Sequence, residues 1–142
     1  MARSVLNERL IIFIDGGSRR NPGPSTTTWI IKTHSEDDLI NGGLFLPHAT
    51  NNIVEYDAFI GSLTDALAFQ PSHIDLFIDS LLVVNQLNHL WEVVHPTLRA
   101  YAATARSLMA TFPTVRLHHV SREFNTDADH LVNSIFQHFL NS

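Results

Sequence analysis

The sequence predicts an α/β fold, a five-stranded mixed sheet in the order βββαβααβα with helices on its faces. Short apolar runs of strand length alternate along the chain with segments whose apolar residues recur at helical spacing. The first three strand-like runs are joined by short links, as in an antiparallel meander, whereas helical segments separate the later ones. Strands one, four and five are therefore expected to lie parallel, with strands two and three antiparallel at one edge.

The five strands are expected at residues 10–14, 26–33, 44–46, 74–78 and 115–120. The first and the fourth are continuous apolar runs, typical of strands buried on both faces, and they lead into Asp15 and Asp79. Residues 16–25 are rich in Gly and Pro and predict a loop. Residues 35–38 and 41–43 have the composition of turns.

Four helices are expected. The first begins at Asn52, ends before Pro71 and has one apolar face, formed by Ile53, Tyr56, Phe59, Ile60, Leu63, Ala66 and Leu67. Ser80 is a good N-cap for a short helix over residues 81–87, and Pro96 suits the start of a third helix that continues to Phe112. Thr126 can cap a final helix, whose inward residues would be Ala128, Leu131, Val132, Ile135, Phe136 and Phe139.

The composition predicts a single domain over residues 1–142. A chain of this length with 44 % hydrophobic content can bury a core without staples, and it has no cysteine for disulfides. No apolar run approaches the roughly 20 residues that cross a bilayer, and no signal or transit segment is evident, so we expect an intracellular protein without membrane contact. The net charge of -5, taken alone, argues against a nucleic-acid partner.

Four carboxylates fall at the ends of predicted elements. Asp15 and Asp79 follow parallel strands, where sites tend to form in open α/β sheets, and Glu55 and Asp129 are expected in the first turns of helices. Each has an ordinary explanation as a turn former, a helix start or a solvated first-turn acid. Gathered together they would repel, so a site holding all four needs hard cations, Mg²⁺ or Mn²⁺ rather than zinc. The chemistry implied is two-metal phosphoryl transfer, with ions roughly 3.5–4 Å apart.

Four segments carry a resemblance to a known family: residues 13–24 (FIDGGSRRNPGP), 50–56 (TNNIVEY), 78–86 (IDSLLVVNQ) and 119–133 (HVSREFNTDADHLVN). In this order and on these elements, the chain resembles the type 1 ribonucleases H. The resemblance implies the ribonuclease H-like fold and an endonuclease that hydrolyses the RNA strand of an RNA·DNA hybrid. It also implies two Mg²⁺ ions, with Mn²⁺ as an alternative, bound by Asp15, Glu55, Asp79 and Asp129. Asp127 is the alternative to the last ligand, but the A-D-x-L-x-N spacing selects Asp129.

The resemblance extends to the substrate contacts. It implies that Asn51 and Asn52 contact RNA bases and 2′-hydroxyls in the minor groove, which suits amides because they both donate and accept. Capping of the helix is the alternative role of Asn51. Further nucleic-acid contacts are expected from Gly16, Ser18, Asn21 and Thr50, the last with a phosphate of the DNA strand.

His119 lies where some members of the family carry a mobile histidine that assists proton transfer and product release. Its near-neutral unperturbed pKa suits that role, and Arg122 is the competing candidate. Because adjacent residues of a strand face opposite sides, only one of His118 and His119 can point at the site.

The chain most resembles family members without a basic handle, because residues 88–95 between the second and third helices contain no Lys. Trp91 in this segment could flank the DNA strand or pack in the core. Three alternatives are considered. The presence of all four acids disfavours a non-catalytic hybrid-binding domain of the same fold, and the Asn pair before Glu55 and the N-P-G-P loop disfavour an integrase-like catalytic core. The nuclease domain of a reverse transcriptase polyprotein stays open, because only flanking sequence would decide it.

The resemblance changes the meaning of the charge. Two divalent cations would contribute +4, which takes the formal balance from -5 to about -1 with metals bound. We therefore expect weak, salt-sensitive binding of the hybrid that depends strongly on metal. We also expect the chain to be a monomer.

Overall fold

The computed structural model describes residues 8–18, 22–33 and 38–120, and this part of the chain contains one five-stranded sheet. Its strands are β1 (Arg9–Ser18), β2 (Gly23–Thr33), β3 (Asp38–Ala49), β4 (His73–Ile78) and β5 (Val115–His119), in the spatial order β3-β2-β1-β4-β5. The β1–β2 and β2–β3 pairs are antiparallel, whereas β4 runs parallel to both β1 and β5. The predicted mixed sheet is confirmed.

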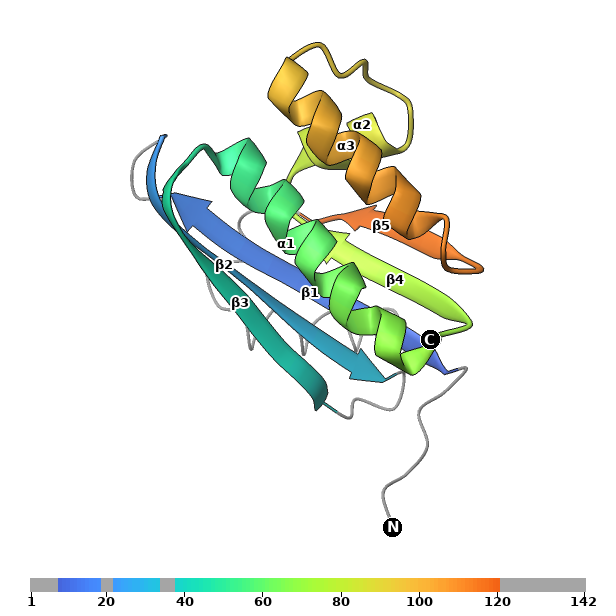
Figure 1. The fold of residues 1–142 in the computed structure, drawn as a ribbon. Helices are drawn as coiled ribbons and strands as arrows, with labels where there is room; N and C mark the ends of the chain where they lie inside the picture. Colours follow the sequence, from blue (N-terminus) through green and yellow to red (C-terminus); the bar gives the residue numbers. More distant parts are fainter. Residues whose placement is uncertain (1–7, 19–21, 34–37, 121–142) are drawn as a thin grey trace.

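Three α-helices connect these strands: α1 (Asn51–Ala66), followed by the short 3₁₀ helix η1 (Leu67–Phe69), then α2 (Leu81–Leu87) and α3 (Pro96–Met109). In Figure 1, α1 crosses one face of the sheet, and α3 lies beside it. The predicted final helix after Thr126 lies outside the described residues. Among the helices that the structure does describe, none is long and apolar enough to cross a membrane.

The main core lies between the sheet and α1. Alternate residues of the strands point into it, as the two-residue period of a strand requires. Its fully buried members include Leu10, Ile12, Ile74, Leu76, Ile78, Tyr56, Phe59 and Leu63. On the opposite face of the sheet, Phe13 stacks on Phe77 with ring centroids 5.3 Å apart, and Phe77 stacks on His118 at 4.7 Å. The strands β1 and β4 are thus buried on both faces, as their apolar runs predict.

The β1–β2 hairpin is longer than the sequence predicts. Residues 16–25 are expected to form a loop, yet β1 continues to Ser18 and β2 begins at Gly23, and Ser18 pairs with Ser25. An antiparallel ladder uses backbone groups, so it continues beyond the apolar run that signals the strand. Asp15 therefore lies inside β1, not at the start of a turn.

The strand β3 also includes residues 41–43, which are predicted to be a turn. Gly42 pairs with Trp29 of β2, and a Cβ atom at Gly42 would overlap the Trp29 indole. A Cβ atom at Gly61 of α1 would overlap the same ring. The two glycines make room for the indole, whose Nε1 donates to Asp65 Oδ2 at 2.8 Å. Gly in this strand thus reflects a close approach and not a turn.

Two helix ends differ from the prediction. Leu67 is expected on the apolar face of the first helix, but it is 42 % exposed. The reason is that α1 ends at Ala66 and the chain tightens into η1, which changes the direction of the following side chains. The third helix is expected to reach Phe112 and ends at Met109, although Phe112 remains buried.

Candidate active site

The strands β1 and β4 bring Asp15 and Asp79 level with each other. The last parallel pair between these strands joins Phe13 to Phe77, and each aspartate lies two residues further along its strand direction. Asp79 follows the end of β4 and is partly exposed, whereas β1 continues past Asp15, which pairs with Thr28 of β2. The side chain of Asp15 lies outside the described part of the structure.

Glu55 is buried, with 8 % of its surface exposed. The sequence predicts it in the first turn of the helix, where it could be a solvated acid. The structure instead caps α1 with Thr50, whose Oγ1 accepts a hydrogen bond from Ile53 N at 3.3 Å, so Glu55 falls in the second turn. Since burial of a charge is costly unless the charge is compensated, Glu55 is not an ordinary surface acid.

The N-terminal end of α1 carries the two asparagines. Asn51 is the first helical residue and is half-buried, and Asn52 is exposed. The alternative role of Asn51 as the N-cap is wrong, because Thr50 caps the helix. In Figure 1 this end of α1 lies at the same end of the molecule as the carboxyl ends of β1 and β4. The asparagines therefore lie toward the end of the sheet that carries Asp15 and Asp79.

The helix α2 begins directly after Asp79. Ser80 caps it, with Oγ accepting a hydrogen bond from Val83 N at 3.2 Å, and both ends of the helix agree with the prediction. Asp79 thus lies between a buried strand and a capped helix, which fixes its backbone from both sides.

The two neighbouring histidines of β5 point in different directions. His118 Nε2 lies 2.8 Å from Asp75 Oδ1, and the same carboxylate lies 3.1 Å from His73 Nε2. His119 is exposed, and its Nε2 donates to the backbone carbonyl of Asp79 at 3.2 Å. The alternation predicted for this pair is confirmed, and His119 is the histidine that lies next to Asp79.

The remaining predicted residues fall outside the described part of the chain. Asp129, its alternative Asp127, Arg122 and Asn21 are among residues 19–21 and 121–142. Of Gly16 and Ser18, the structure describes the backbone pairing in β1 only.

Within the described residues, no three His, Asp or Glu side chains form a group that could hold a metal ion. Two of the four predicted ligand side chains, those of Asp15 and Asp129, are not among the side chains described. The other two, Glu55 and Asp79, supply carboxylate oxygens, the donors that suit Mg²⁺. The donor chemistry that is described is thus compatible with a magnesium site, with Asp15 placed beside Asp79 by the strand register.

Buried hydrogen bonds link the helices α1, α2 and α3, and the sequence pattern does not predict them. Tyr56 of α1 donates through its hydroxyl to Gln86 Oε1 of α2 at 2.7 Å, and Arg106 Nη2 of α3 donates to the Gln86 carbonyl at 2.6 Å. Tyr56 is fully buried and Gln86 is 4 % exposed. The one available signal is a single polar residue on the inner face of an apolar helix.

The structure is a mixed α/β domain with the sheet order β3-β2-β1-β4-β5, in which Asp15 lies within β1, Asp79 follows β4 and Glu55 lies on the covering helix α1. Comparison with known proteins gives the family. Residues 13–135 match the model of the reverse transcriptase-like family, so the chain belongs to this ribonuclease H-like family.

Characterised relatives and solved structures agree with this assignment. The chain is 38 % identical over 125 residues to ribonuclease HI of Halobacterium salinarum, covering 88 % of this chain and 63 % of that protein. It is 34 % identical to a bifunctional protein of Mycobacterium tuberculosis, covering 88 % of this chain and 35 % of that protein. The structure of LC11-RNase H1 in complex with RNA/DNA hybrid superimposes with a TM-score of 0.77 at 32 % identity, covering 88 % of this chain and 94 % of that one. The chain thus spans less than two thirds of the length of these two sequence relatives.

Proposed function

We propose that the chain is an endonuclease that hydrolyses the RNA strand of RNA·DNA hybrids with two Mg²⁺ ions. The observation that carries the proposal is the strand register that brings Asp15 level with Asp79, in a chain similar to ribonuclease HI over 88 % of its length. We propose further that residues 1–142 act as one domain and as a monomer. The intracellular location stays a prediction.

Asp15, Glu55, Asp79 and Asp129 would hold the ions. When bound, such ions activate a water molecule and stabilise the leaving oxygen of the phosphodiester. The protein's own contribution is rigidity: Asp79 lies between a buried strand and a capped helix, and Glu55 projects from a helix that packs on the same sheet. Mn²⁺ could replace Mg²⁺ at either position, since Mg²⁺ and Mn²⁺ both favour oxygen ligands.

His119 would move a proton beside Asp79. Because its Nε2 donates to the Asp79 carbonyl, the neutral ring leaves Nδ1 as an acceptor, which could take up a proton near the reacting phosphate. A histidine on the exposed end of β5 can also change rotamer, as product release requires. Arg122 remains the alternative for this role.

Asn51 and Asn52 would recognise the RNA strand through its 2′-hydroxyls. Thr50 would bind a phosphate of the DNA strand. Its Oγ1 accepts the capping hydrogen bond from the Ile53 backbone N–H, and the same hydroxyl can still donate its proton to a phosphate oxygen. Gly16, Ser18 and Asn21 would contribute further contacts along the hairpin.

The test is cleavage of an end-labelled RNA·DNA hybrid with and without Mg²⁺ or Mn²⁺, for the wild type, Asp79→Asn and Glu55→Gln. We expect metal-dependent cleavage of the RNA strand only in the wild type. Asp57→Asn is a matched control, because Asp57 lies on the same helix as Glu55 but its carboxylate hydrogen-bonds Tyr101. If the wild type cuts no better than Asp79→Asn, the domain is a non-catalytic binder.

His119→Ala should lower kcat less than the loss of either carboxylate, because a general acid or base contributes less than the metal site. Equal losses would assign His119 to the core of the machinery or to the fold. Unfolding curves of each variant separate the two.

A further inference from the structure

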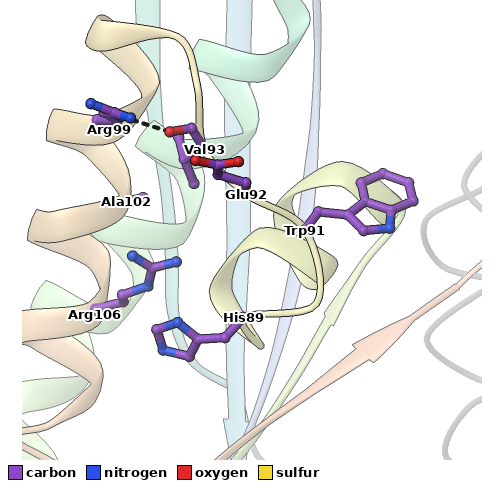
Figure 2. A pocket seen from close by; sticks show the side chains of 7 residues that line it. All are labelled: His89, Trp91, Glu92, Val93, Arg99, Ala102 and Arg106. Carbon is purple, nitrogen blue, oxygen red and sulfur yellow. Dashed lines mark hydrogen bonds between the residues drawn. The ribbon is translucent and has the colours of Figure 1, made fainter.

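A cavity of about 470 Å³ lies between the helix α3 and residues 89–93 of the segment that joins α2 to α3. It is distinct from the carboxylate site. Figure 2 shows Arg99 and Arg106 projecting from α3 toward the segment that carries His89 and Glu92. Its volume is within the range typical of small-ligand sites, and its polar lining is mainly basic.

The two arginines form one basic wall. They are seven residues apart and so lie on the same face of α3. Arg99 Nε donates to the carbonyl of Val93 at 2.7 Å, and Arg106 Nη2 donates to the carbonyl of Gln86 at 2.6 Å. These bonds fix both guanidinium groups in place but do not neutralise them. Across residues 8–18, 22–33 and 38–120, neither arginine is in an ion pair with a carboxylate.

His89 completes the basic lining in an unusual backbone conformation. Its φ is 61°, in the left-handed region that glycine adopts most easily and that is common just after a helix end. A side chain at such a position is retained at some cost in backbone strain, and strain of this kind often marks a functional site. Here the side chain lines the cavity that Arg106 also lines.

Arg99, Arg106 and His89 outnumber the single acid of the cavity, Glu92. Guanidinium groups that are already oriented are well suited to phosphate oxygens, with which they form charge-assisted hydrogen bonds. We propose that this cavity binds a phosphate group. The helix α2, which is seven residues and roughly 10 Å long, lies between Asp79 and His89 in the chain. The phosphate could therefore belong to the nucleic-acid strand at the carboxylate site or to a free nucleotide.

The binding test needs neither metal nor catalysis, so it does not depend on the proposed nuclease activity. Inorganic phosphate and AMP are titrated into the metal-free full chain at constant ionic strength, and backbone amide shifts of residues 88–95 are followed by NMR. We expect saturable shifts in the wild type. Arg99→Gln and His89→Gly should each weaken binding by about tenfold or more, since the first removes a charge-assisted contact and the second removes an imidazole N–H donor.

His89→Gly separates binding from folding. Glycine fits the left-handed conformation, so this variant should be at least as stable as the wild type while it binds phosphate more weakly. Gln70→Gly is the matched control, because Gln70 has φ 45° and does not line this cavity. It should leave phosphate binding unchanged. Absence of saturable shifts in the wild type, or equal affinity in His89→Gly, would overturn the proposal.

The source of the phosphate is decided by a second measurement, the KM for the hybrid in the same variants. A higher KM with unchanged kcat in Arg99→Gln and His89→Gly identifies a backbone phosphate of the substrate. An unchanged KM together with weaker AMP binding identifies a free nucleotide.

Discussion

The buried hydrogen bond between Tyr56 and Gln86 predicts a stability effect that can be separated from packing. Gln86→Met preserves the approximate volume of the side chain and removes the acceptor of the Tyr56 hydroxyl, which is fully buried. A buried donor left without a partner costs about 1–3 kcal/mol of unfolding free energy. We expect a destabilisation in that range for Gln86→Met.

The double variant Tyr56→Phe with Gln86→Met tests the reasoning. Replacing both partners by apolar groups leaves no unsatisfied donor, so much of the loss should be recovered. Urea unfolding of the wild type, both single variants and the double variant completes a double-mutant cycle, with equal m-values as the condition for comparison. If the double variant is no more stable than Gln86→Met, then packing and not the hydrogen bond causes the loss.

Three further predictions concern other parts of the described chain. Burial raises the pKa of Asp75, but hydrogen bonds from His118 and His73 outweigh burial and hold this pKa well below its usual range. The stability that the Asp75 carboxylate contributes is therefore present above about pH 4 and is lost as the pH falls through the lowered pKa. Asp75→Asn should therefore flatten the acid limb of a stability–pH profile, and an unchanged limb would contradict this. Gly42→Ala should cost about 1–3 kcal/mol in urea unfolding, because the new Cβ atom overlaps the Trp29 indole; a neutral result would mean that the sheet edge yields easily. Mg²⁺ at one hundred times its dissociation constant should raise the unfolding free energy of the wild type by about 2.7 kcal/mol. It should not raise that of a variant that lacks one of the proposed ligands. An equal gain in both proteins would place the ion elsewhere.

The elements that the sequence predicts best are those set by local chemistry. Ser80 followed by an apolar run gives both ends of α2, and the apolar run before Asp79 gives β4. Each depends on neighbouring residues alone, either through a cap or through burial on two faces. The alternation of His118 and His119 follows in the same way from the strand period.

The elements that the sequence predicts poorly depend on distant partners. Gly42 looks like a turn residue until Trp29 occupies the space above it. Residues 16–18 look like a loop because nothing in their composition reveals the paired strand β2. Glu55 is the fifth residue of α1, one position later than predicted, because Thr50 caps the helix and Asn51 is its first residue. In each case a contact made across the sheet or at a helix end overrides local composition.

The site and the acidic composition of the chain together imply a coupling between metal and substrate. The four carboxylates that we propose as metal ligands would repel a phosphate backbone until cations neutralise them. Arg99 and Arg106 line a separate cavity and do not compensate this repulsion. Metal binding should therefore strengthen hybrid binding. By linkage the hybrid must strengthen metal binding by the same factor, because the coupling free energy between two sites is reciprocal. An affinity for the hybrid that is the same with and without Mg²⁺ would show that the carboxylates do not face the substrate, whatever their register in the sheet.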